Sequence, residues 1–260
     1  MTGVFWGLLL SSLALSVFTL GVWGRHIGES AARYRVSWQP DGRAFSIWWL
    51  LYTTTLAAAI VGLALHAAVD QDALLLWSGT WVLTAIWVIL FDNQRQLVLA
   101  ALVLLGAFGT SLCALLLQQA WPSHSGEQIL LFAPLSLLSG WLLVASSVGL
   151  GTALTCDEPA FGEIKADNEV SLRIWEDATR DAIFARQKEA TTTQVVMVVI
   201  LALVGGCLAL AVPDPLFVWP IVWAVLLQRG FPRSGWMWIA LAILIAGCAV
   251  SIQRVYVWEF

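Results

Sequence analysis

Long apolar stretches alternate with short polar segments along most of the chain. A helix that crosses a membrane needs about 20 predominantly apolar residues, and eight stretches approach or reach that length. They cover residues 3–23, 45–69, 73–91, 97–117, 129–154, 195–212, 216–228 and 235–252. The pattern predicts an all-α integral membrane protein, a bundle of about eight transmembrane helices that forms one polytopic domain over residues 1–260.

Two of these stretches need a closer look. The stretch 216–228 is short and contains Pro220, so it spans only if Arg229 snorkels and the helix continues towards Phe231. The first stretch, 3–23, has the length of a signal sequence, but no basic residue precedes it and no small-residue cleavage site stands out after it. We expect a retained helix.

The basic residues support this count and give an orientation. Lys and Arg concentrate in the loops on the cytoplasmic side, and with eight spans Arg254 alone falls on the opposite side. The other twelve basic residues share one side: Arg25, Arg33, Arg35, Arg43, Arg95, Lys165, Arg173, Arg180, Arg186, Lys188, Arg229 and Arg233. Both termini are therefore expected on the outer or lumenal side.

The connection 155–194 is long and acidic, with nine Asp and Glu against five Lys and Arg. Leu172, Trp175 and Ile183 recur within it at helical spacing. This indicates a partly amphipathic helix that lies at the interface or docks on a partner through these residues. The alternative is a solvated loop helix with one incidental aromatic residue.

Composition excludes several classes of protein. With 60% hydrophobic and 12% charged residues and a mean hydropathy of +0.82, the chain lacks the polar surface of a soluble domain. A net charge of −4 provides no basic surface for nucleic acid. The four cysteines are scattered, and the three inside apolar runs are predicted to be small buried side chains without a metal or a disulfide framework.

Candidate catalytic groups are scarce. Ionisable residues inside a membrane usually mark function, yet His66, near the end of the second stretch, is the one histidine within a span. A structural role is favoured for it, with axial ligation of a porphyrin as the alternative. No phosphate-binding loop, catalytic triad or metal-ligand spacing is recognisable, so we expect neither an enzyme nor a metal site.

Tryptophan is the abundant residue that could form a binding site, and the chain has sixteen of them. Some fall at expected interfaces, where indole rings anchor helices. Others fall inside the spans, where they pack the core or line a pocket for a flat apolar ligand. The internal set is Trp48, Trp49, Trp81, Trp87 and Trp141.

The order of residues around these tryptophans resembles a known family. Segment 38–52 reads WQPDGRAFSIWWLLY, segment 83–91 reads LTAIWVILF, with Thr84 where Asn is usual, and segment 133–145 reads APLSLLSGWLLVA. A later group comprises Asp214, Phe217 and the VWA of 222–224. Together they resemble the longer branch of the tryptophan-rich sensory protein and translocator protein (TspO/MBR) family.

The resemblance implies a helical bundle whose pocket is capped by the loop before the second helix. It implies a flat lipophilic ligand, of the porphyrin, chlorin or sterol type, and does not extend to porphyrin degradation. A bound porphyrin, chlorophyll-type pigment or lipid is the cofactor it suggests. Ligand-binding candidates carried over from the family or adjoining its motif are Trp38, Pro40, Phe45, Trp48, Trp49, Tyr52, Trp87 and Trp141.

Two functions follow as hypotheses. The first is a non-catalytic protein that binds such a ligand in a Trp-lined pocket, alone or as a homodimer. The second is an accessory subunit of a larger photosynthetic or respiratory membrane complex, docked through segment 155–194. A secondary transporter is disfavoured because intramembrane charges and an inverted repeat are lacking. Both hypotheses place the chain in a bacterial inner membrane or an organellar inner or thylakoid membrane.

Overall fold

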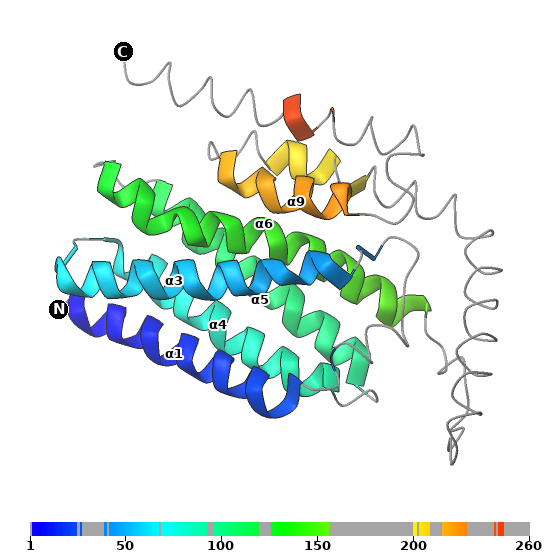
Figure 1. Ribbon diagram of the computed structural model, residues 1–260, viewed down its shortest axis with the longest axis horizontal. Coiled ribbons are helices and arrows are strands. Elements are labelled where there is room, and N and C mark those ends of the chain that lie inside the picture. Colours follow the sequence, from blue (N-terminus) through cyan, green and yellow to red (C-terminus); the bar gives the residue numbers. More distant parts are fainter. Residues whose placement is uncertain are drawn as a thin grey trace.

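The structure is a computed structural model, and almost all of the part that it describes is helical (Figure 1). The described residues are 2–24, 27, 39–40, 42–67, 69–92, 96–119, 126–155, 200–201, 203–208, 215–227, 242 and 244–246. The elements in chain order are α1 (Thr2–Trp23), the 3-10 helix η2 (Gly42–Ser46), α3 (Ile47–Ala64), α4 (Gln71–Asp92), α5 (Leu97–Gln119), α6 (Gly126–Thr155) and α9 (Pro215–Leu226).

The predicted fold class is confirmed. Five of these helices, α1, α3, α4, α5 and α6, are long and apolar enough to cross a membrane. The shorter α9 coincides with the seventh predicted span. Helical residues at 200–201 and 203–208 fall within the sixth, and those at 242 and 244–246 within the eighth. Within the described ranges every predicted span thus contains helix, and no strand occurs.

The second helix ends earlier than the predicted stretch 45–69, and the backbone at its end explains why. His66 adopts a left-handed conformation with φ 49°. Its N–H donates to the carbonyl of Leu63 at 3.3 Å, and the N–H of Ala67 donates to the carbonyl of Gly62 at 3.0 Å. This pair of bonds is the Schellman arrangement that closes helices. The apolar pattern continues through it because apolar residues also occupy the turn.

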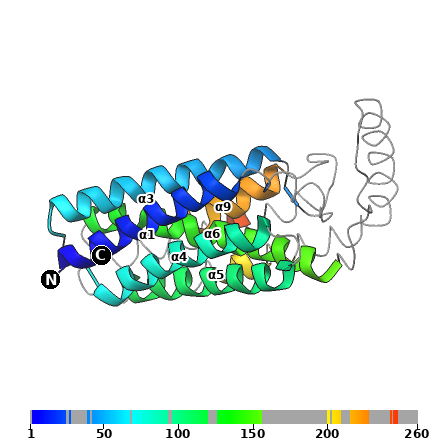
Figure 2. The same cartoon turned by 90° about the horizontal axis from the view of Figure 1, so that it is seen from below.

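The contacts between the five long helices close a ring, and Figure 2 shows these helices from the side, lying along one another. α1 packs against both α3 and α4, α4 packs against α5, α5 against α6, and α6 against α3. α3 and α4 therefore lie across the ring from each other. Large side chains of both helices, Tyr52 and Trp81 among them, meet in its interior with ring centroids 5.0 Å apart.

The contact between α1 and α3 depends on a glycine. A Cβ on Gly62 would overlap the indole ring of Trp6, so the missing side chain creates the space into which that ring fits. Trp6 is fully buried, and its Nε1–H donates to the carbonyl of Ala67 at 3.4 Å. One indole thus joins the start of α1 to the end of α3.

α9 lies along α6, outside the ring (Figure 1). A Cβ on Gly140 would overlap the backbone carbonyl oxygen of Phe217, so the two helices approach closely there. α9 also contacts residues 203–208, since a Cβ on Gly205 would come within 2.7 Å of the Cδ1 of Ile221. Phe217 and Ile221 are fully buried. This short helix is therefore packed into the main core.

The outer surface of the bundle is apolar, whereas many hydroxyl groups face inward. Phe18 and Val98 are largely exposed, while Ser16 and Thr55 are fully buried. This distribution suits a lipid solvent, which is as apolar as the side chains it meets. The same fact corrects the expectation for the cysteines: of those described, Cys113 and Cys207 are free and exposed, because an apolar stretch does not reveal which side faces lipid.

Candidate functional site

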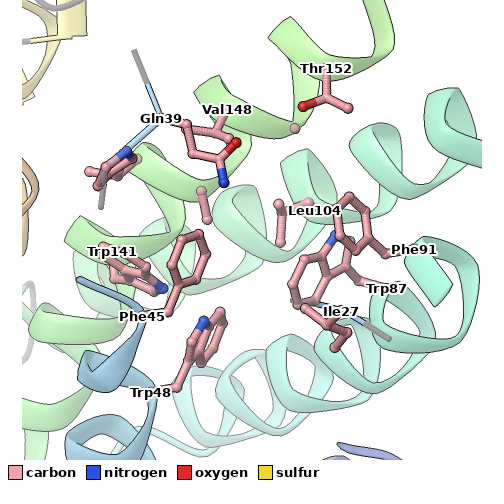
Figure 3. Close-up of a pocket in the computed structure, with 14 residues that line it drawn as sticks. Ile27, Gln39, Phe45, Trp48, Trp87, Phe91, Leu104, Trp141, Val148 and Thr152 are labelled. Atoms are coloured by element: carbon pink, nitrogen blue, oxygen red, sulfur yellow. The ribbon is translucent and has the colours of Figure 1, made fainter. Parts of the chain in front are cut away.

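A pocket lies at the end of the ring where α3 begins and where α4 and α6 end (Figure 3). It encloses a cavity of about 40 Å³, and the space out to its open mouth is about 560 Å³. Its lining comes from four helices of the ring and from the segments before α3: Ile27, Gln39, Pro40, Phe45, Trp48, Trp87, Phe91, Leu104, Trp141, Val144, Ala145, Val148, Gly149 and Thr152.

Aromatic rings on three helices form the wall. Trp48 stacks on Trp87 with centroids 6.1 Å apart and an interplanar angle of 21°. Trp141 stands edge-on to both Phe45, at 5.8 Å and 89°, and Trp48, at 6.2 Å and 90°. Trp87 in turn stacks on Phe91 at 5.4 Å. Offset and edge-on pairs are the favoured aromatic geometries, so the rings of the wall are in good contact with one another.

A second layer of aromatic residues supports this wall from deeper in the ring. Tyr52 lies one turn beyond Trp48, with ring centroids 6.1 Å apart, and stacks on Trp81. Its hydroxyl group is 3.2 Å from the Oγ of Ser16 on α1. Tyr52 therefore links α1, α3 and α4 behind the pocket.

The pocket offers few polar groups. Gln39 and Thr152 are the polar side chains in the described lining, and no charged residue is among them. Trp141 adds an indole N–H that is buried and has no hydrogen-bond partner within the described residues. In Figure 3 its nitrogen lies on the side of the ring towards Phe45. No group of metal-binding side chains occurs in the described part of the chain. The pocket therefore suits a ligand that has a largely apolar surface and a few hydrogen-bond acceptor atoms.

The structure brings most of the predicted site residues together. Pro40, Phe45, Trp48, Trp87 and Trp141 all line the pocket. Phe45 and Trp48 are one helical turn apart at the entry to α3, so they share a face, as their spacing indicates. Tyr52 follows on the same face, behind the lining.

Two candidates lie elsewhere. Trp49 is 70% exposed, because it is rotated about 100° from Trp48 on the helix and so points outward to the lipid side. His66 is exposed in the turn that follows α3, at the end of the helix opposite the pocket, with its Nδ1 3.4 Å from the carbonyl oxygen of Ala64. Neither residue lines the pocket.

The remaining candidates fall outside the described residues. They are Trp38 in the segment before α3, and Leu172, Trp175 and Ile183 in the 155–194 connection. The partly amphipathic helix expected in that connection and its docking role stay predictions.

Several lining residues were missed by sequence reasoning, although a signal for them was present. Phe91 is one helical turn after Trp87, and Val144, Val148 and Thr152 follow Trp141 on one face of α6. They could have been found by stepping three or four residues at a time along the helix from Trp87 and Trp141, because such residues share one helix face. Gln39 has no such signal, since it precedes the helix.

Thr84, which stands where the family pattern has Asn, is fully buried on α4. Its hydroxyl donates to the carbonyl of Thr80, one turn back, at 2.8 Å. The side chain thus satisfies its hydrogen bond within its own helix, which is the usual solution for a threonine in an apolar interior.

The fold and the site define a polytopic α-helical membrane protein with an aromatic pocket inside a five-helix ring. The chain belongs to the TSPO-like protein family: residues 4–162, more than half of its length, match that family's model. The matched range contains all five long helices and most of the described pocket lining. No curated protein and no solved structure matches the chain. The resemblance at 214–224 lies beyond the matched range.

Proposed function

We propose that this protein binds a flat lipophilic ligand with the character of a porphyrin, chlorin or sterol, without transforming it. The observation that carries the proposal is the pocket walled by Trp48, Trp87 and Trp141. Membership of the TSPO-like family agrees with a non-catalytic membrane protein of this kind.

Binding requires the wall to open. The enclosed space of about 40 Å³ holds little more than a few water molecules. A flat ring inserted between Trp48 and Trp87 needs carbon contacts of about 3.5 Å on each of its faces, so these two rings, which now stack on each other, must move apart to admit it. Trp48 is half-buried at the start of α3, so it is the wall residue that has to move for the ligand to enter.

The polar groups suggest how the ligand is oriented. An acceptor oxygen on the ligand would pair with the buried N–H of Trp141, which gains more from this bond than an N–H already exposed to water. Gln39 is also close by in the lining. A ligand with an apolar body and a carbonyl or carboxylate edge therefore suits the pocket better than a pure hydrocarbon.

Titration of the purified protein with protoporphyrin and with a sterol tests the proposal. We expect saturable binding of at least one probe, weakened about fivefold to tenfold in Trp48→Leu by the loss of aromatic stacking. Trp49→Leu is the matched control: it removes the neighbouring indole, which faces away from the pocket, and should bind like the wild type. If neither probe saturates, or if both variants lose affinity equally, the proposal is wrong.

The accessory-subunit hypothesis depends on the acidic 155–194 connection, which follows directly from the pocket end of α6. It predicts that extraction from native membranes in mild detergent yields a larger complex on a native gel. Replacing Leu172, Trp175 and Ile183 by Ser should release the chain from that complex. Migration of the native chain only as a monomer or homodimer would contradict this hypothesis.

A further inference from the structure

α9 makes two contacts with the elements that carry the pocket, although it lies outside the residues that match the family. Trp223 donates from its Nε1–H to the backbone carbonyl of Ala44 at 3.3 Å, across 179 positions of sequence. Phe217 packs its backbone against Gly140 on α6. The two contacts lie two helical turns apart on α9, and each reaches a different wall of the pocket.

Each contact lies directly beside a lining residue. Ala44 is fully buried in η2 and precedes Phe45, whose ring stands edge-on to Trp141. Gly140 precedes Trp141 itself. The backbone positions next to both partners of this aromatic pair are therefore fixed from outside the ring by one short helix.

α9 is itself firmly packed. Its inner residues Phe217, Val218, Ile221, Ala224 and Val225 are essentially inaccessible to solvent. Residues 203–208 pack against it through Gly205 and Ile221. Because α9 is buried and packs against both α6 and residues 203–208, it provides a firm support for the bond from Trp223.

We propose that α9 is a clamp on the pocket, in which Trp223 and the contact between Phe217 and Gly140 act as positioning elements that hold η2 and α6 around the ligand. The clamp slows the opening of the wall, so it sets the rate at which a bound molecule leaves. The inference rests on the proposed function for the identity of the ligand, but the effect of the clamp on the pocket wall does not require a bound ligand.

The clamp predicts a change that can be measured without ligand. Trp223→Phe keeps an aromatic ring and removes the N–H, so η2 loses its bond to α9. Hydrogen exchange at residues 42–52, followed by mass spectrometry on the purified protein, should become about fivefold faster, the size expected for the loss of one hydrogen bond. Trp219→Phe is the matched control, since Trp219 stacks on Trp223 at 5.6 Å but is 42% exposed; exchange should stay as in the wild type.

A second variant tests the other contact. Gly140→Ala places a methyl group against the carbonyl of Phe217 and pushes α9 away from α6. We expect faster exchange again at residues 42–52, whereas Gly109→Ala on α5, where a Cβ meets nothing within 4 Å, leaves it unchanged. If Gly140→Ala does not fold, Trp223→Phe alone decides the matter.

The same variants connect the clamp to binding. With protoporphyrin as the probe, Trp223→Phe should raise the dissociation rate about fivefold while Trp219→Phe does not. Unchanged exchange and unchanged dissociation in Trp223→Phe would overturn the clamp even when the wild type binds. If the wild type binds neither protoporphyrin nor the sterol but exchange accelerates, the clamp stands and the ligand class proposed above is wrong.

Discussion

Trp141 carries a polar group that no described residue pairs with. Its indole N–H is buried without a partner within the described residues, and so is that of Trp77, deeper in the ring. Such a group costs free energy unless something else pairs with it. At Trp141 a ligand in the pocket can supply the missing hydrogen-bond acceptor. Trp77 lies outside the pocket lining, so a ligand cannot pair with its N–H.

This difference gives a prediction at the scale of one atom. Trp141→Phe keeps a ring edge-on to Phe45 and Trp48 but removes the N–H, so the affinity for an acceptor-bearing ligand such as protoporphyrin should fall about fivefold to tenfold. Trp77→Phe should leave the affinity unchanged. Equilibrium titration of both variants provides the comparison, and equal affinities in Trp141→Phe and wild type would show that this N–H does not contact the ligand.

His66 provides a second prediction. Its left-handed backbone costs an ordinary residue about 1–2 kcal/mol, and glycine is the residue that normally closes a helix in this way. His66→Gly should therefore raise the free energy of unfolding by up to about 1 kcal/mol, measured as a higher thermal midpoint in detergent. Ligand binding should be unaffected, since the residue is at the far end of α3. Loss of a bound porphyrin in this variant would instead support axial ligation.

At the scale of the element, helix contacts depend on small residues that admit a large neighbour. Gly62 accommodates the indole of Trp6, and Gly140 accommodates the backbone of α9. Membrane helices commonly use small residues in this way, because close van der Waals packing replaces the hydrophobic effect between them.

The contact at Gly62 is testable by a single methyl group. Gly62→Ala should destabilise the protein by about 1–3 kcal/mol, the usual cost of overpacking, because Trp6 is fully buried and has no room to move. Gly7→Ala is the control, since a Cβ there meets nothing within 4 Å. Thermal unfolding in one detergent measures both. Equal midpoints for the two variants would show that Trp6 can yield.

The elements were largely predictable from the sequence, and the packing was not. The length of each apolar stretch predicted the ends of the long helices to within a few residues in most cases. The exception is the end of α3 near His66, where the turn is as apolar as the helix. The order of the family motifs along the chain predicted that Trp48, Trp87 and Trp141 form one pocket wall. The outward direction of Trp49 and the contact between Trp223 and Ala44 depend on helix rotation and on long-range packing, neither of which periodicity determines in a chain that is apolar on all sides.

At the scale of the whole molecule, the five-helix ring coincides with the range that matches the family, and α9, which lies beyond that range, packs on α6. The pocket lies at one end of the ring, formed by the start of α3 and the ends of α4 and α6. The chain segments that join helices at this end carry most of its basic residues, Arg33, Arg95 and Arg173 among them.

This coincidence orients the pocket. Because Lys and Arg concentrate on the cytoplasmic side, we predict that the pocket opens towards the cytoplasm or its organellar equivalent and that the turn between α3 and α4 faces the opposite compartment. In a variant without native cysteines, Asp72→Cys should react with a membrane-impermeant maleimide in intact cells. Glu169→Cys, in the acidic connection, should react only after permeabilisation. The reverse pattern would place the pocket on the outside, and the ligand would then have to arrive from the outer compartment instead of from the cell interior.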